Sequence, residues 1–197
     1  MNKSAYKICN TCVMDTSDPR IQFNSSGKCE YCENFEAKIL PSWNHGEGKS
    51  VALGNLADRI KKQGQGKDFD CILGMSGGID SSYLLYLVKE ELGLRPLVFH
   101  VDAGWNSQIA VNNIERLVDG LGVDLYTEVI NWEDMKNLQR AYFKSGVPHI
   151  DTPQDHSFFS TMYKFAADNN VKDIVTGGNY STECIRNPKE WMYFQSD

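Results

Sequence analysis

Residues 70–82 read Asp-Cys-Ile-Leu-Gly-Met-Ser-Gly-Gly-Ile-Asp-Ser-Ser, a serine- and glycine-rich turn between a short apolar run and an amphipathic segment. The apolar run predicts a buried strand, and apolar residues at helical spacing after the turn predict a helix that ends at Gly93. Gly77 and Gly78 let the backbone approach a ligand closely, and the helix dipole favours an anion at its N-terminus. The stretch therefore predicts an anion site. The residues expected on the buried face of this helix are Tyr83, Leu84, Leu87, Val88 and Leu92.

The turn lacks two common nucleotide-binding patterns. It has neither the lysine of Gly-x-x-x-x-Gly-Lys-Ser/Thr nor the Gly-x-Gly-x-x-Gly of dinucleotide-binding folds. Serine hydroxyls can bind phosphate oxygens instead, whereas Asp80 repels an anion unless a metal ion lies between them. The pattern favours a magnesium pyrophosphate ligand, with Ser76 and Asp80 as catalytic residues. The alternative is an ordinary turn in which Ser76 or Asp80 only caps the helix.

The segment Ser-Gly-Gly-Ile-Asp-Ser-Ser resembles the pyrophosphate loop (PP-loop) of the N-type ATP pyrophosphatases. These enzymes cleave ATP between the α and β phosphates and adenylate an oxygen of the substrate. The resemblance implies that the loop holds the β and γ phosphates together with Mg²⁺ at Asp80. The loop residues that it assigns to ATP are Ser76, Gly77, Gly78, Asp80, Ser81 and Ser82.

Composition limits the class of protein. The chain has 197 residues and a formal net charge of −6, which argues against an extended nucleic-acid surface. No apolar run approaches the roughly 20 residues of a membrane span, and the polar start Met-Asn-Lys-Ser is unlike a signal peptide. We expect a cytoplasmic protein.

Four of the six cysteines form two Cys-x-x-Cys pairs, Cys9 with Cys12 and Cys29 with Cys32. The two-residue gap turns both sulfurs of a pair toward one ion, and the sixteen residues between the pairs are typical of a zinc ribbon. The spacing predicts a structural zinc ion with four protein ligands. Disulfides, unrelated thiols or iron are the alternatives. Cys71 is expected in the core and Cys184 in a loop.

Three segments are expected along the chain. Residues 1–40 predict a zinc-ribbon-like segment, residues 41–67 a linker and helix, and residues 68–197 a PP-loop ATP pyrophosphatase domain. Strands and helices alternate in the last segment, which predicts an α/β fold with a mainly parallel sheet and helices on both faces. The resemblance makes this fold adenine nucleotide α-hydrolase-like. The further strands are expected at residues 97–101, 125–130 and 174–176.

Other polar residues follow the predicted strands, where ligands bind in such sheets. His100 and Asp102 end the second strand, and the resemblance places the adenosine of ATP there; the alternatives are a core histidine and a carboxylate that closes the strand end. After the fourth strand, two glycines permit close approach to a nucleotide, and Glu183 offers an oxygen ligand for Mg²⁺ or is an exposed carboxylate. The nucleotide-binding candidates in this second group are Gly177, Gly178 and Asn179.

Asp155 and His156 precede or open another predicted helix, in the run Asp-Thr-Pro-Gln-Asp-His. A histidine beside an aspartate at a helix start suits substrate binding or proton transfer. The alternative is that Pro153 starts a turn and Asp155 caps the helix.

Taken together, the motifs are similar to the N-acetyl sugar amidotransferase family, which includes WbpG-type lipopolysaccharide biosynthesis proteins. They are the paired Cys-x-x-Cys, the PP-loop, His-Val-Asp-Ala-Gly-Trp, Pro-Gln-Asp-His and Thr-Gly-Gly-Asn. The resemblance implies a carbon–nitrogen ligase that adenylates the acetamido oxygen of a nucleotide-linked N-acetyl sugar and releases pyrophosphate. Ammonia then displaces AMP to form an acetamidino group in surface polysaccharide (LPS O-antigen) biosynthesis.

The family also implies partners. Neither Cys71 nor Cys184 lies in a Gly-x-Cys-x-Gly elbow, so the sequence shows no glutaminase nucleophile. The resemblance assigns ammonia supply to a glutaminase subunit and a cyclase-like subunit. Family members continue beyond residue 197, so we expect part of the sugar-binding region to be missing.

Two other functions are alternatives. A PP-loop enzyme that thiolates tRNA also combines cysteine pairs with such a loop, but commonly uses further cysteines, and only Cys71 and Cys184 are spare here. A zinc-ribbon interaction module with an inactive nucleotide fold would be expected to carry a broken loop, and this loop is intact.

Overall fold

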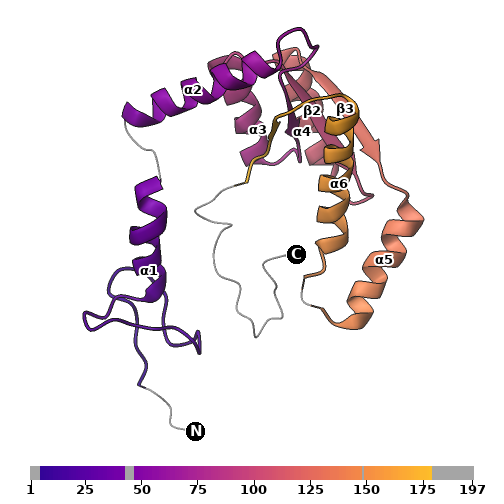
Figure 1. The fold of residues 1–197 in the computed structure, drawn as a ribbon. Coiled ribbons are helices and arrows are strands. Elements are labelled where there is room, and N and C mark those ends of the chain that lie inside the picture. The colour runs from indigo at the N-terminus through magenta and orange to yellow at the C-terminus, as the bar shows by residue number, and fades with distance from the viewer. Residues whose placement is uncertain (1–4, 43–46, 148, 179–197) are drawn as a thin grey trace. The chain divides into compact units, whose positions relative to one another are not determined.

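The computed structural model describes residues 5–42, 47–147 and 149–178 (Figure 1). The chain divides into two compact units, residues 1–52 and residues 53–197. No helix formed by the described residues is both long enough and apolar enough to cross a bilayer.

The first unit is built from short turns rather than a sheet. Isolated antiparallel bridges join Ile8 to Asp15 and Phe23 to Cys29. Helix α1 (Glu30–Asn34) follows and runs into a π-helical turn and a 3-10 turn, Phe35–Ile39 and Leu40–Ser42. Within residues 5–41, only Cys9, Gly27 and Cys29 are buried. This part of the chain therefore has two cysteines where a larger domain has an apolar core.

The second unit holds a four-stranded parallel sheet, as the alternation of strands and helices predicted. The strand order is β3-β2-β1-β4, and Leu73 of β1 pairs with Val98 on one side and Val175 on the other. The strands are β1 (Cys71–Gly74), β2 (Pro96–Asp102), β3 (Asp124–Val129) and β4 (Ile174–Val175). The helices are α2 (Glu47–Gln63), α3 (Ile79–Tyr86), its π-helical extension Leu87–Glu91, α4 (Gln108–Leu121), α5 (Trp132–Ser145) and α6 (Thr152–Asp168).

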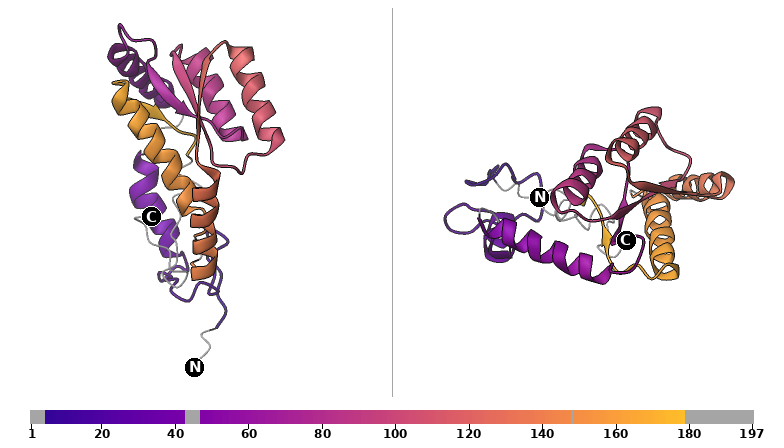
Figure 2. Two further views of the ribbon diagram at one scale, coloured as in Figure 1. Left: turned by 90° about the vertical axis from the view of Figure 1, so that its right-hand side faces the viewer. Right: turned by 90° about the horizontal axis from the view of Figure 1, so that it is seen from above.

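Helices cover both faces of the sheet, and Figure 2 shows α3 and α4 on one side with α6 on the other. On the first side, Leu73 packs with Leu85 of α3 and Ile114 of α4. On the second side, Ile72 and Phe99 pack with Met162 of α6. Successive residues of a strand face opposite sides of the sheet, so the continuous apolar run of β1 fills both cores.

The buried face of α3 and its extension differs from the predicted face at Tyr83. This residue is 61% exposed and stacks on Tyr86 at the surface, whereas Ser81 and Leu85 are buried. Of the other predicted residues, Val88 is buried, and Leu84 and Leu92 pack against the core. The helical period was therefore right, and Leu85 takes the buried place expected for Tyr83.

Asp70 and Arg95 join the segments that lead into β1 and β2. The Asp70 side chain is 4% exposed, and its carboxylate accepts hydrogen bonds from the Arg95 backbone N–H at 2.8 Å and from Nη2 at 2.6 Å. The same guanidinium donates to the Gly64 carbonyl at 3.0 Å. These bonds hold the start of β1 against the end of the helix before it.

Asp70→Asn is expected to lower the free energy of unfolding of the second unit by about 2 kcal/mol. The substitution removes the carboxylate and so the ion pair of Arg95, but the Arg95 side chain is half exposed, and its hydration recovers part of the lost free energy. Urea unfolding followed by circular dichroism measures the change. Asp168→Asn, which removes an exposed pair with Lys164, is the control and should cost less than about 0.5 kcal/mol. Equal losses would contradict the role given to Asp70.

Candidate functional site

A cavity of about 510 Å³ opens at the carboxyl ends of β1, β2 and β4. Its walls include Met75 after β1, His100 in β2 and Thr176 after β4. The chain leaves β1 toward β2 on one side and returns to β4 on the other, so the cavity lies at the switch point where α/β sheets bind ligands. The volume is in the range of small-molecule sites, roughly 300–1,000 Å³.

The glycine turn forms one wall, through Ser76, Asp80 and Ser81. The two serine hydroxyl oxygens lie 3.1 Å apart, and Ser81 Oγ donates to the Gly78 carbonyl at 3.2 Å. Ser82 Oγ donates to the same carbonyl at 2.6 Å and is not part of the cavity wall. Of the predicted loop residues, Ser76, Asp80 and Ser81 thus face the cavity, while Ser82 braces the first turn of α3.

Gly77 requires the absence of a side chain for two reasons. Its φ angle is +77°, in the left-handed region, and a Cβ there would stand 2.5 Å from the Ala110 carbonyl oxygen of α4. Gly78 is the N-cap of α3 and has extended backbone. The first amides of α3 therefore begin directly at the cavity wall, in the geometry that favours an anion.

His100 is buried and lines the cavity. Its Nδ1 lies 2.9 Å from the Met75 carbonyl, and its Nε2 lies 3.0 Å from the Asn106 side-chain nitrogen. A carbonyl only accepts, so Nδ1 donates and Nε2 accepts from Asn106. His100 therefore joins the strand end before the glycine turn to the loop after β2.

Asp102 closes the end of β2, which was the alternative to a role in binding adenosine. Its Oδ1 accepts a hydrogen bond from the Gly104 N–H at 2.8 Å, and it does not line the cavity. The structure thus places His100, rather than Asp102, at the cavity wall.

Aromatic side chains line the same cavity as the glycine turn, and sequence reasoning missed their part in the site. Trp105, Phe158 and Phe159 line it, with Gln154 beside them. The Trp105 indole N–H donates to Gln139 at 2.5 Å, and its ring packs edge-on against Trp132 with centroids 5.3 Å apart. The signal available in the sequence was that Trp105 lies three residues after the end of β2, in the region where such sheets bind ligands.

The two glycines after β4 differ in their places. Gly177 lines the cavity, and a Cβ there would lie 3.1 Å from the Ser81 backbone nitrogen. Gly178 is exposed and is not part of the wall. The other predicted residues of this group, Asn179 and Glu183, lie outside the described residues, as does Cys184.

Asp155 and His156 do not line the cavity, although their neighbour Gln154 does. Helix α6 begins at Thr152 with Asp151 as its N-cap, so the alternative that Asp155 caps this helix is wrong. Burial, followed by the nearby Asp151, raises the pKa of Asp155. The helix starts four residues earlier than a cap at Asp155 would place it.

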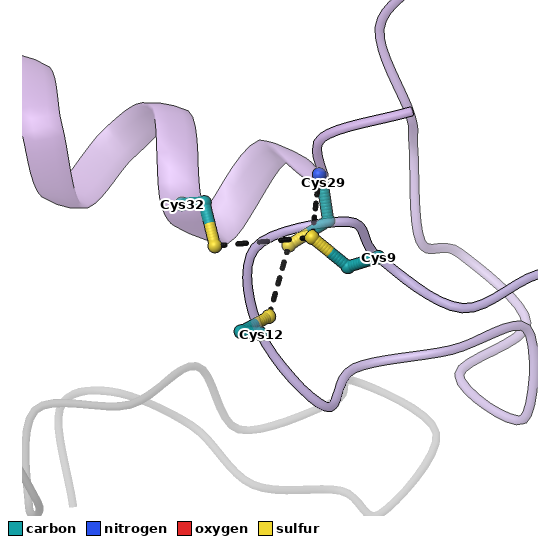
Figure 3. Close-up of side chains that lie close together, drawn as sticks. All are labelled: Cys9, Cys12, Cys29 and Cys32. Atoms are coloured by element: carbon teal, nitrogen blue, oxygen red, sulfur yellow. Dashed lines mark hydrogen bonds between the residues drawn. The ribbon is translucent and has the colours of Figure 1, made fainter. Parts of the chain in front are cut away.

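The four paired cysteines converge in the first unit (Figure 3). Cys12 Sγ lies 3.6 Å from Cys29 Sγ, Cys9 Sγ lies 3.9 Å from Cys32 Sγ, and all four sulfurs lie within 4.8 Å of one another. Sulfurs bound tetrahedrally to zinc at about 2.3 Å stand about 3.8 Å apart, whereas disulfide sulfurs are about 2.05 Å apart. The cluster therefore fits a zinc ribbon.

Hydrogen bonds and burial shift the pKa values of these thiols in different directions. Backbone N–H groups of Thr11 and Cys29 donate to Cys9 Sγ at 3.3 and 3.2 Å. Desolvation acts to raise the pKa of Cys9, but backbone hydrogen bonds from Thr11, Cys29 and Cys12 together outweigh it and lower the pKa to about 6. Desolvation raises the pKa of Cys29 and of Cys32. Binding of an ion therefore releases protons from the second pair.

Sequence comparison gives partial matches. No family model matches the chain. It is 33% identical over 119 residues to an uncharacterized protein of Methanocaldococcus jannaschii, covering 59% of this chain and 40% of that protein. It is 31% identical over 123 residues to tRNA-specific 2-thiouridylase MnmA 2 of Fusobacterium nucleatum, covering 57% of this chain and 34% of that enzyme. The matches thus span two fifths or less of these relatives.

Solved structures share the fold. The second-unit architecture is similar to NMN synthetase from Francisella tularensis, with a TM-score of 0.50 and 19% identity over 70% of this chain and 56% of that one. It is also similar to glutamine-dependent NAD⁺ synthetase from Acinetobacter baumannii in complex with ADP, with a TM-score of 0.53 and 19% identity over 82% of this chain and 30% of that one. The predicted α/β fold is thereby confirmed as that of the NAD synthetases.

Proposed function

We propose that this chain binds ATP with Mg²⁺ and cleaves it between the α and β phosphates to adenylate an oxygen of its substrate. The observation that carries this proposal is the cavity at the strand ends, which Ser76, Asp80 and Ser81 line together with Trp105. The serines and the carboxylate suit a metal-bound pyrophosphate, and the indole ring suits an aromatic base. ADP in the related Acinetobacter structure supports an adenine nucleotide in this fold.

Each group has a stated part in this reaction. Mg²⁺ supplies charge neutralisation of the leaving pyrophosphate, and Asp80 is the carboxylate placed to hold it. Ser76, Ser81 and the first amides of α3 bind the phosphate oxygens. The Trp105 ring, fixed by Gln139 and Trp132, offers a rigid flat surface for the base. The chain needs no side-chain nucleophile, since it positions ATP against the acceptor oxygen.

For the acceptor, we favour the acetamido oxygen of a nucleotide-linked N-acetyl sugar, with ammonia from a partner glutaminase forming the acetamidino product. An amide carbonyl is a weak electrophile, and adenylation of its oxygen makes AMP the leaving group. The joint presence of paired cysteines, PP-loop and Pro-Gln-Asp-His supports this choice, and Gln154 of that motif lines the cavity. A cyclase-like subunit that delivers the ammonia belongs to the same proposal.

Thiolation of tRNA is the second candidate, favoured by the likeness to the Fusobacterium thiouridylase. Cys71 does not support it. This residue is fully buried in β1 among apolar side chains, and burial, followed by Asp70 and Asp173, raises its pKa to about 12. Among the described residues, no cysteine lines the cavity.

One assay separates the two candidates. The protein is incubated with ATP and Mg²⁺ in two reactions. One contains UDP-N-acetyl sugars and ammonia, and the other contains tRNA and a sulfur donor. We expect AMP, pyrophosphate and a sugar product about one mass unit lighter, because oxygen is replaced by NH. If AMP is released with tRNA and a sulfur donor but not with the sugars, the sugar proposal is overturned and the proposed cleavage of ATP stands. Failure to bind ATP would overturn both.

A further inference from the structure

Helix α4 holds the glycine turn through Ala110, which lines the cavity, and through Asn113, which does not. The Asn113 side-chain amide donates a hydrogen bond to the Gly77 carbonyl at 3.1 Å. The backbone of Ala110, one turn earlier, occupies the space that a Gly77 side chain would need. Asn113 is half-buried and is not part of the cavity wall.

This hydrogen bond acts on the peptide between Gly77 and Gly78. The peptide is trans, so its carbonyl and its N–H point in opposite directions. With the carbonyl turned to Asn113, the Gly78 N–H faces the other way and donates a long hydrogen bond to Ser76 Oγ at 3.4 Å. Ser76 lines the cavity, whereas Gly78 does not. Two successive glycines leave this peptide unusually free to rotate, so an external bond is needed to hold its plane.

We propose that Asn113 is a positioning residue that turns the Gly78 amide toward the phosphates of the nucleotide. Asn113 acts through the Gly77 carbonyl rather than on the nucleotide or the metal. The inference rests on the proposed function, because it requires a phosphate ligand in the cavity. It gives α4 a part in the site besides its packing on the sheet.

The test compares Asn113→Ala with Asn112→Ala in the full chain. Asn112 is the neighbouring asparagine on the same helix, and its side chain accepts from Gln108 at the surface, 2.8 Å away. Calorimetric titration measures the binding of magnesium pyrophosphate and of ATP. We expect Asn113→Ala to bind both about 10- to 100-fold more weakly, the effect of misaligning one hydrogen bond to a charged group, and Asn112→Ala to stay within about twofold of wild type.

A second readout needs no ligand. The backbone amide resonance of Gly78 in two-dimensional NMR spectra should move, and its hydrogen exchange should accelerate, in Asn113→Ala but not in Asn112→Ala. If the wild type binds pyrophosphate and Asn113→Ala binds it equally well, the positioning role is overturned while the proposed function stands. If the wild type binds neither ligand, the proposed function fails. If the Gly78 resonance is also unchanged in Asn113→Ala, the role of Asn113 in orienting that amide is overturned as well.

Discussion

Asp80→Asn is expected to reduce pyrophosphate release from ATP by roughly 100- to 1,000-fold. Asp80 lies on the cavity wall beside Ser76 and Ser81, the position from which a carboxylate can reach a metal ion on the phosphates. The substitution keeps the side-chain shape and removes the charge, so under the proposed function the Mg²⁺ would lose its anionic protein ligand. Continuous assay of released pyrophosphate under saturating ATP measures the effect.

Two controls accompany Asp80→Asn. Asp119→Asn removes the same charge near the far end of α4, at an exposed position, and should leave the rate unchanged. Thermal unfolding of both variants shows whether the fold persists. Full activity in Asp80→Asn would exclude Asp80 as a ligand of the catalytic metal, and equal loss in both variants would assign the effect to net charge.

Removal of zinc is expected to unfold the first unit and leave the second unit folded. Within residues 5–41, two of the three buried residues are cysteines, so the metal takes the place of an apolar core. Structural zinc sites contribute on the order of 10 kcal/mol to the folding of such small segments. Elemental analysis should find one zinc per chain, and NMR spectra before and after chelation should lose dispersed signals from residues 5–42 only.

Zinc affinity should fall as pH falls. Cys29 and Cys32 have a raised pKa, so both are protonated in the metal-free protein near neutral pH and release their protons when zinc binds. Each released proton lowers the affinity about tenfold for each pH unit of acidification, so these two thiols alone give a loss of about 100-fold. Competition with a chelator over this pH range measures the slope. A slope near zero, or a protein purified without metal, would contradict the zinc site.

The sequence predicted most of what is local in this protein. The Cys-x-x-Cys pairs, the strand before the glycine turn and the helix after it all depend on residues within a few positions of one another. The parallel sheet followed as well, because alternating strands and helices leave few other arrangements. The predicted strand at 97–101 and the observed β2 differ only at their ends.

The predictions failed where a shift of a helix by one or two residues changes which side chains are buried or line the cavity. Tyr83 was expected in the core, yet Leu85 is buried in its place. Gln154 lines the cavity, and the predicted Asp155 does not. Neighbouring residues on a helix point about 100° apart, so a small shift in where the helix begins exchanges wall residues for exposed ones.

By itself, the sequence determined most elements of this protein, the convergence of its four paired cysteines and the glycine turn between a strand and a helix. Spacing along the chain encodes these features, because backbone geometry repeats over short distances. The tertiary structure alone decided that Trp105 lines the same cavity as that turn and that Asn113 holds the turn from α4. Such contacts join elements that meet only when the sheet is packed on both faces, and packing depends on the fit of many side chains at once.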